Sequence, residues 1–395
     1  MLPFFLIARG CHSLASTMLV VSLGWHLYEF SGDPLDLAFV GLAQILPVFL
    51  FFFASGWAVD HFSRERLVKL CLLVDLVCFS AMGWIMLEST INTAWIYTLV
   101  FVQGASKAFA SPAMQAIVPN IVVKSQLNRA IAMTSTTWNF AMTIGPAIAG
   151  LLILWLDRSV YFVIAACAVV GLLAISRLPR IKAAGSQKRS WNDLSAGLRL
   201  VFNNPILLGS LSLDLLIVGL GSVLVLLPIY ATDIFQVGPE DLGIMRAMPG
   251  IGSVLMGLYM SKRAELDKAG LKLLIALTVF SLSIATFALT DSYWIALAAL
   301  FVYGASDMVS VNIRMTLIQL ATPDELRGRV SAVNSLFIAT SNEAGDFRGG
   351  ATAAAIGPVA TATVGAGLAL AITLWGYKTF PSLFKLDRVD SVKPS

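Results

Sequence analysis

Charged residues are scarce in this sequence. They make up 13% of the 395 residues, about half their share of a typical soluble domain, while apolar residues make up 57%. The hydrocarbon core of a bilayer takes roughly 20 apolar residues per helical span, so this excess leaves room for about ten to twelve spans. The shortage of charge excludes a water-soluble fold of this size and predicts an all-α polytopic membrane protein.

Cysteine and histidine are also rare, with four and three residues. The cysteines lie inside apolar runs, without a CxxC or Cys/His pattern, and we interpret them as small buried apolar side chains: Cys11, Cys71, Cys78 and Cys167. The sequence thus predicts neither a metal nor a cofactor. The net charge of +4 is too small to indicate nucleic acid, and the basic residues are not gathered into a patch, so no nucleic-acid partner is expected.

Twelve apolar stretches follow one another in two series of six. They run over 4–29, 35–59, 67–88, 93–118, 128–156 and 159–177, and then over 205–232, 240–261, 270–290, 293–320, 329–356 and 358–380. The sequence therefore predicts twelve transmembrane helices. It divides into an N-terminal six-helix bundle (1–176), a cytoplasmic linker (177–204), a C-terminal six-helix bundle (205–380) and a cytoplasmic tail (381–395).

The linker carries a helical pattern of its own. Its apolar side chains recur at helical spacing and predict an amphipathic helix on the membrane surface: Trp191, Leu194, Leu198, Val201 and Phe202. Ser190 can cap this helix at its start.

Lysine and arginine are distributed unevenly between the loops on the two sides of the membrane. If the N-terminus is cytoplasmic, 21 of the 27 basic residues fall in the linker, the tail and the other loops on that side, and Arg158 alone falls in the opposite loops. The remaining five lie within spans or at their ends: Arg9, Lys107, Arg246, Arg314 and Arg348. This distribution predicts that both termini lie in the cytoplasm.

The two halves contain a repeat at an offset of 200 residues. FVQGASK at 101–107 matches FVYGASD at 301–307, which places Lys107 opposite Asp307. The register continues through Arg129 and Arg329, Gly145 and Gly345, and Gly150 and Gly350. Two parallel repeats about an axis along the membrane normal are an architecture of secondary transporters, with a binding site near the midplane between the halves.

Several segments resemble signatures of the major facilitator superfamily. Residues 56–66 (GWAVDHFSRER) are similar to its G-x-x-x-D-R-x-G-R-R loop, and residues 145–150 (GPAIAG) are similar to its antiporter motif G-P-x-x-G-G. Residues 226–252 and 312–347 resemble the drug and siderophore exporter branch, and the likeness covers nearly the whole chain. The chain departs at His61, Ser63, Glu65 and Ala149, and residues 347–350 read FRGG where relatives have FESG.

The loop signature has two interpretations. Gly56, Asp60, Arg64 and Arg66 form a cytoplasmic latch between the halves if their charges meet acidic groups, helix ends or lipid phosphates across the loop. Alternatively, this cluster only anchors the topology.

Small residues in the paired fifth and eleventh spans also allow two interpretations. Gly145, Pro146, Gly150, Gly345 and Gly350 permit close helix approach and a local kink. Such sites serve as static packing or as the pivot of rocking between the halves.

Ionisable side chains deep in apolar spans are the strongest functional signal, because they are costly in hydrocarbon and usually face a cavity or a partner. Nine qualify: Arg9, Asp75, Lys107, Asp214, Asp307, Arg314, Glu343, Asp346 and Arg348. The resemblance implies a central cavity lined by the first, fourth, seventh and tenth spans, and hence by Arg9, Lys107, Asp214, Asp307 and Arg314. Trp25 is an aromatic candidate for stacking on a substrate, or it packs, and the neighbouring His26 is interpreted as a packed polar residue.

Glu343 and Asp346 are three residues apart and share a helix face. Two carboxyl groups in such a site are candidates to bind and release a proton as access alternates. The alternative is a structural ion pair with Arg348, Lys107 or Arg314. Asp75 lies on a span expected to be peripheral and is more readily interpreted as structural.

Together these features predict a proton-coupled secondary transporter that exports a small amphipathic molecule, such as a siderophore or drug, by alternating access. We expect a monomer in the bacterial cytoplasmic (inner) membrane, with a small-molecule substrate, protons and the lipid bilayer as partners. A lipid or lysolipid flippase and a non-transporting sensor on the same scaffold are the alternatives. An enzyme is not expected, because no HExxH, GxSxG or other nucleophile constellation occurs.

Overall fold

The computed structural model describes residues 1–395 apart from 89–91, 182–197, 263–267, 324–325, 385 and 387–395. The residues it describes form helices joined by short connections, without a strand. They group into two compact units. Unit 1 comprises Met1–Gly32, Phe39–Arg189 and Val237–Ala247, and unit 2 comprises Asp33–Ala38, Ser190–Gln236 and Met248–Ser395. The prediction of an all-α protein is confirmed.

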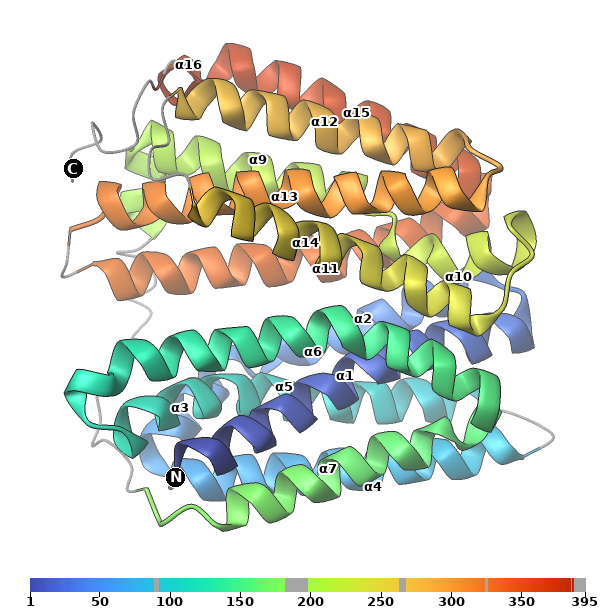
Figure 1. Ribbon diagram of the computed structural model, residues 1–395, viewed down its shortest axis with the longest axis vertical. Coiled ribbons are helices and arrows are strands. Elements are labelled where there is room, and N and C mark those ends of the chain that lie inside the picture. The colour runs from blue at the N-terminus through green and yellow to red at the C-terminus, as the bar shows by residue number, and fades with distance from the viewer. Residues whose placement is uncertain (89–91, 182–197, 263–267, 324–325, 385, 387–395) are drawn as a thin grey trace. The chain divides into compact units, whose positions relative to one another are not determined.

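The described residues of the first half form the following helices (Figure 1). They are α1 (Leu2–Ser31), α2 (Pro34–Leu50), α3 (Phe52–His61), α4 (Arg64–Leu87), α5 (Thr93–Ile121), α6 (Leu127–Leu156) and α7 (Val160–Ser176).

The second half is built in the same way, with one additional interruption. Its helices are α9 (Pro205–Gly221), α10 (Leu227–Ile229), α11 (Pro239–Ser261), α12 (Ala269–Leu289), α13 (Tyr293–Ala321), α14 (Arg327–Ile356), α15 (Pro358–Thr379) and α16 (Pro381–Phe384).

The principal helix pairs of the first half recur in the second. In unit 1, α1 packs on α6 and α7, and α4 packs on α5 and α7. In unit 2, α9 packs on α14 and α15, and α12 packs on α13 and α15. An offset of 200 residues carries each of the first set onto the second. The packing therefore follows the repeat found in the sequence.

Length and composition alone identify fewer spans than the sequence predicts. Among the described residues, eight continuous helical stretches are long and apolar enough to cross a membrane, or nine if the bent pair α2 and α3 is one span. One of the eight, Arg129–Ser176, contains both α6 and α7, and neither α5 nor α14 is among them. The chain is a multi-pass membrane protein, and the count of twelve spans stays a prediction.

The predicted span 35–59 is bent rather than straight. The axes of α2 and α3 differ by 56° across the break. Pro47 lies inside α2, where it cannot donate to the carbonyl four residues earlier and its ring crowds that carbonyl. The helix ends at Leu50, three residues after Pro47.

Glycines in the repeated FV-x-GAS segments explain why the two copies kept that sequence. Gly104 of α5 lies against the backbone of Gln44 and the ring of Pro47 in α2. Gly304 of α13 lies against the carbonyl of Pro249 in α11, and Ser253 donates to the Gly304 carbonyl at 2.8 Å. A side chain at either glycine would hold the paired helices apart.

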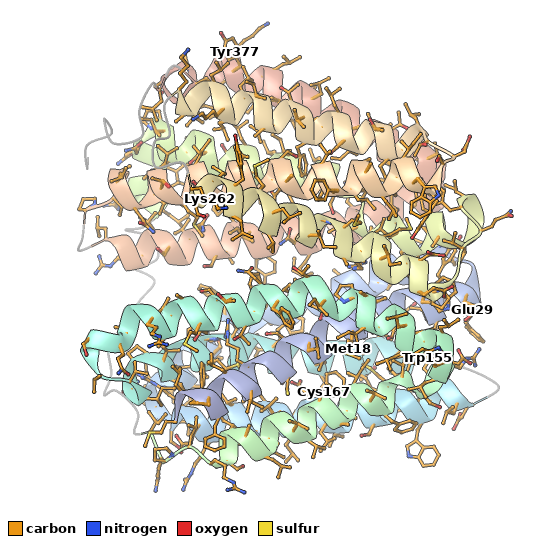
Figure 2. The ribbon with its side chains drawn as sticks, in the orientation of Figure 1. Met18, Glu29, Trp155, Cys167, Lys262 and Tyr377 are labelled. Atoms are coloured by element: carbon orange, nitrogen blue, oxygen red, sulfur yellow. The ribbon has the colours of Figure 1, made fainter. Side chains whose placement is uncertain are left out.

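Large apolar side chains cover the outer faces of the helices. Leu73 and Val77 of α4 are exposed, as is Trp155 at the end of α6, which points away from its neighbours in Figure 2. In water such a surface would be unfavourable, whereas in a bilayer it faces acyl chains and tryptophan suits the interface. The exposed surface therefore agrees with a membrane environment.

The predicted linker helix falls largely on 182–197, outside the described residues. Residues 198–203 are helical, and Val201 is fully buried against Leu207, Ile318 and Val330. Phe202 is exposed. The described end of the linker is thus packed onto unit 2 through Val201.

Candidate functional site

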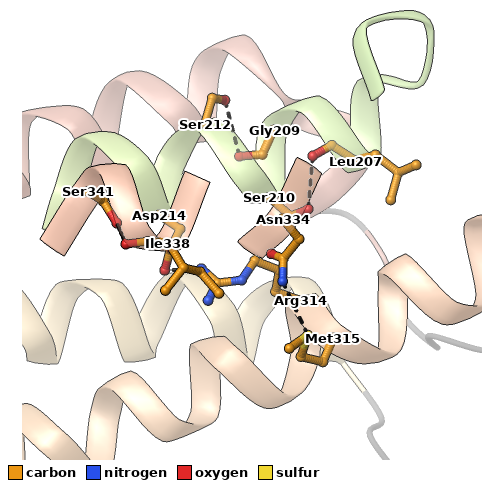
Figure 3. A network of polar contacts seen from close by, with 10 residues as sticks. All are labelled: Leu207, Gly209, Ser210, Ser212, Asp214, Arg314, Met315, Asn334, Ile338 and Ser341. Carbon is orange, nitrogen blue, oxygen red and sulfur yellow. Dashed lines mark hydrogen bonds and ion pairs between the residues drawn. The ribbon is translucent and has the colours of Figure 1, made fainter. Parts of the chain in front are cut away.

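An ion pair lies inside unit 2, between α9 and α13. Asn204 caps the start of α9, where its side chain accepts the N–H groups of Ile206 and Leu207. The helix then carries Asp214 inward, where its carboxylate pairs with the guanidinium of Arg314 (Figure 3). The side chains of Asp214 and Arg314 are only 9% and 3% exposed. Two opposite charges this deep in a span compensate each other's cost of burial.

A recess adjoins this pair, enclosed by α9, α12 and α13. We refer to it as the first recess, and it is lined by Asp214, Ile217, Val218, Ala276, Leu277, Phe280, Ser306, Asp307 and Ser310. Asp307 is half-buried there, two turns before Arg314 on the same helix. The structure thus brings together three of the predicted site residues: Asp214, Asp307 and Arg314.

Arg348 stabilises an interruption in the seventh predicted span. After Gly221 the chain leaves the α-helix, makes a short 3-10 turn at Leu224–Leu226 and ends in a π-helical turn at Tyr230–Ile234. The Arg348 guanidinium donates to the carbonyls of Gly219 and Ser222 at 3.2 and 3.3 Å. Because carbonyls at a helix end need donors in a membrane, Arg348 has a structural role that the sequence reasoning did not anticipate.

Arg348 also borders a second recess. This second recess lies between α9 and α14, has a volume of about 250 Å³ and is lined by Leu215, Leu216, Gly219, Leu220, Thr340, Ser341, Ala344 and Arg348. Its wall is mostly apolar, with one cation at the side. Such a wall suits an amphipathic molecule.

Unit 1 presents a different arrangement at the equivalent depth. Arg9 of α1 is half-buried, and its Nη1 lies 4.0 Å from the sulfur of Met114 in α5. Its Nε is buried without a hydrogen-bond partner among the described residues. Arg9 is thus a cation whose described surroundings are soft and apolar.

Four other predicted residues lie on α5, α14 and α1. Lys107 of α5 and both Glu343 and Asp346 of α14 are half-buried. Trp25 is buried in α1. The proposed roles of these side chains rest on their position in the spans.

The loop signature makes its described contacts inside unit 1. Arg64 is buried, and its Nη1 donates to the carbonyl of Ala116 in α5 at 2.7 Å. Glu65, noted in the sequence only as a departure from the signature, is 2% exposed and accepts the N–H of Ile181 at 2.9 Å. Gly56 is buried, Asp60 half-buried and Arg66 exposed. The latch between the halves stays a prediction.

The paired glycines lie at matching close approaches. Gly145 of α6 faces Thr17 of α1, and Gly345 of α14 faces Val218 of α9. Gly150 meets Gly243 within unit 1, and Gly350 meets Ala38 within unit 2.

Pro146 takes part in one of these approaches through its backbone. Its carbonyl lies where a side chain at Gly243 would stand. These sites are packed closely, and a role in rocking stays a proposal.

Two histidines hold polar contacts in α1. His26 is buried, with Nδ1 3.3 Å from the Tyr161 hydroxyl and Nε2 3.3 Å from Asp157, which agrees with the interpretation of a packed polar residue. Glu29, labelled in Figure 2, brings a third ligand atom within 4.8 Å of His26 and Asp157, but both carboxylates are exposed. The second histidine, His12, was not singled out in the sequence. It lies within the same helix, and its Nδ1 is 3.1 Å from the buried carboxylate of Asp75.

Comparison with known proteins identifies the family. A family model described as transmembrane secretion effector, of the major facilitator type, matches residues 4–393. The chain belongs to this family. It is similar to the multidrug efflux pump Tap of Mycolicibacterium fortuitum, with 28% identity over 337 residues, 80% of each chain. It is also similar to the enterobactin exporter EntS of Shigella boydii serotype 18, with 27% identity over 337 residues, 82% of this chain and 79% of that one.

Solved structures share the fold. A bacterial homologue of the human lysosomal transporter Spinster superposes with a TM-score of 0.75 at 15% identity, covering 98% of this chain and 97% of that one. The nucleoside transporter NupG gives a TM-score of 0.73 at 14% identity, covering 96% and 98%. Likeness at this identity concerns the fold alone. The predicted major facilitator fold is confirmed. This chain is a transporter of an exporter branch and not an enzyme.

Proposed function

We propose that this transporter is a proton-driven exporter of a small amphipathic molecule. The names of its relatives, an efflux pump and a siderophore exporter, support outward transport of a drug or siderophore. The positive-inside distribution supports a bacterial cytoplasmic membrane location with both termini in the cytoplasm. The protein works as a monomer by alternating access of its two halves.

The observation that carries the proposal is the buried Asp214–Arg314 pair beside Asp307. Asp307 shares the first recess with Asp214 but stands two turns from the arginine on α13. Burial makes the ionised form of a carboxylate in such a place unfavourable. Binding of a proton removes its negative charge, and movement of the substrate can offset the free-energy cost of releasing that proton again.

The remaining site residues supply charge to the transport pathway. Glu343 and Asp346 on α14 are a second candidate proton site, because they share one helix face. Arg9 and Lys107 favour anionic groups on the substrate. Trp25 offers an aromatic face near the outer half of α1.

The experiment is transport in proteoliposomes driven by an imposed pH gradient. The probes are a catecholate siderophore, a hydroxamate siderophore and a cationic dye, each supplied separately. We expect Asp307→Asn to lose the gradient-driven component and Asp214→Asn to lose most transport, because it leaves Arg314 without its partner. Asp291→Asn, at an exposed connection, removes the same charge and retains wild-type flux. Full coupling in Asp307→Asn, Glu343→Gln and Asp346→Asn alike contradicts proton drive through these groups.

A lipid flippase is the second candidate, favoured by the second recess. Its leucine-lined wall with Arg348 at the side suits an acyl chain and an anionic headgroup. The same vesicles carry a fluorescent lysolipid as a further probe. Movement of this lipid without movement of the other three probes would replace the exporter assignment, and flux of none of the four would favour a sensor.

A further inference from the structure

Unit 1 contains a buried histidine–aspartate pair that the proposed mechanism does not use. His12 Nδ1 of α1 lies 3.1 Å from Asp75 Oδ2 of α4. The side chains are 10% and 1% exposed. The second carboxylate oxygen, Asp75 Oδ1, is buried and has no hydrogen-bond partner among the described residues. One acceptor of this carboxylate is therefore open to a proton.

The pair lies well inside two long apolar helices. Counting 1.5 Å per residue, His12 is about 15 Å from the start of α1 and Asp75 about 16 Å from the start of α4. A buried apolar cluster, which includes Phe5, Ala8 and Leu72, lies between the pair and those helix ends. These apolar side chains separate the pair from the water at those helix ends.

His12 and Asp75 connect α1 and α4, two helices whose main contacts are with other helices. The main contacts of α1 are with α6 and α7, and those of α4 are with α5 and α7. Where α7 packs on both helices, a Cβ at Gly171 of α7 would stand at contact distance from Ala8 and Leu72. A change in the hydrogen bond between His12 and Asp75 thus acts directly on the spacing of α1 and α4.

Among the described residues, neither His12 nor Asp75 forms an ion pair with a lysine or an arginine. On α1, the Arg9 guanidinium points to the Met114 sulfur of α5. Thiols lie on the same helices: Cys11 on α1, Cys71 and Cys78 on α4, and Cys167 on α7, which faces α1 in Figure 2. The half-buried Lys107 lies on α5. From α5, the side chain that reaches α4 here is the neutral Ser106, which donates to the Cys71 carbonyl.

The two units differ in their buried pairs. At the offset of 200 residues, Ser212 and Ile275 stand where unit 1 has His12 and Asp75, while Leu14 and Met114 stand where unit 2 has Asp214 and Arg314. Arginine stays charged under all physiological conditions, whereas histidine changes charge nearest to neutral pH. Of the two buried pairs, the one in unit 1 is therefore the one without a permanent cation.

We propose that His12 and Asp75 form an additional proton-binding site, in unit 1. This inference rests on the proposed proton-driven export and adds a site to it. With one proton the pair is neutral overall, as imidazolium and carboxylate or as imidazole and carboxylic acid. Removing that proton leaves one negative charge, and a second proton leaves one positive charge, both costly in an apolar interior. Exchange with water therefore requires the helix movement that accompanies transport.

Infrared pH-difference spectroscopy on the purified full chain tests proton binding directly. We expect a pH-dependent carboxyl band that Asp75→Asn removes and whose midpoint His12→Gln shifts. Ser106→Ala changes a neighbouring neutral contact and keeps the band. A wild-type midpoint that His12→Gln leaves unchanged, or a spectrum that Asp75→Asn leaves unchanged, overturns the proposal.

Transport in vesicles then tests coupling. The dye, the catecholate siderophore and the hydroxamate siderophore serve as probes. We expect the double variant His12→Gln, Asp75→Asn, whose amides can still bond, to exchange a transported probe without a gradient and to lose the gradient-driven component. Retained gradient-driven transport in that variant overturns a role in coupling. If the wild type itself ignores the gradient, proton-driven export fails, and the carboxyl band alone still decides whether the pair binds a proton.

Discussion

Gly304 shows how a single residue sets a helix contact. A Cβ at this position would overlap the carbonyl group of Pro249 on the neighbouring helix, and backbone cannot move aside as a side chain can. The repeat in the sequence indicates that Gly304 and Gly104 are equivalent, but it does not indicate what either residue touches, because the partners lie on other helices.

We expect Gly304→Ala to destabilise the protein. Alanine gains roughly 0.5–1 kcal/mol over glycine within a helix, but overpacking a close contact costs about 1–3 kcal/mol, so the loss prevails. Gly367→Ala is the matched control, because a Cβ there meets nothing within 4 Å. The measurement is thermal unfolding in detergent: Gly304→Ala should melt lower than the wild type and Gly367→Ala should melt at the same temperature or higher. Equal melting of the two variants would contradict the packing role.

At the same scale, the sequence identified buried charges more readily than their partners. Asp214 and Arg314 were both predicted from their places in apolar spans, and the structure pairs them. For Arg348 the hydrophobic pattern gave the depth but not the partners, because its acceptors are carbonyls released where α9 ends. The pairing depends on the approach of distant helices, which periodicity does not encode.

Among the elements, the helix ends beside the first loop are tied to one another. Arg64 and Glu65 begin α4, and they hold the last turns of α5 and the segment that follows α7. These contacts contribute to stability because they are buried. An exposed charge contributes little, whereas a buried N–H that loses its acceptor is left without a hydrogen-bond partner.

We expect Glu65→Ala to loosen the segment after α7. It leaves the N–H of Ile181 without an acceptor, at a cost of about 1–3 kcal/mol. Hydrogen–deuterium exchange of the amide of Ile181 should become faster, and Glu65→Gln, which keeps an acceptor oxygen, should restore most of the protection. Arg66→Ala is the control, since Arg66 is exposed. Unchanged exchange in Glu65→Ala would show that the bond does not stabilise this end.

The positions of the helices could be predicted from the hydrophobicity of the sequence, but the breaks within them could not. Each predicted apolar stretch coincides with a helix or with a broken helix. The breaks at Pro47 and after Gly221 lie inside apolar runs, where the composition stays uniform while the backbone changes course. Proline and glycine give a local signal for such breaks, but neighbouring helices decide whether a span bends or continues.

For the whole molecule, the charge pattern along the loops predicts orientation. Nearly all the loop lysines and arginines fall on the side of the two termini, with Arg158 as the exception. Positive charge in short loops resists translocation, so this asymmetry sets which way the chain inserts.

Reporter fusions measure this orientation. If the C-terminus is cytoplasmic, as we propose, a fluorescent protein fused after Ser395 should fluoresce, and alkaline phosphatase at the same place should be inactive. Phosphatase fused after Arg158 should be active. The opposite pattern at both positions would invert the topology.

The repeated helix pairing has a consequence for how such a protein can evolve. Two identical halves assembled as separate chains would carry every buried charge twice, at symmetric places. Joined in one gene, one copy could keep an arginine at Arg314 while the other carries a methionine at Met114, and the histidine of one could be serine in the other. Fusion of the repeats thus allows the two halves to differ: one can hold a buried pair that includes a permanent cation, and the other a buried pair without one.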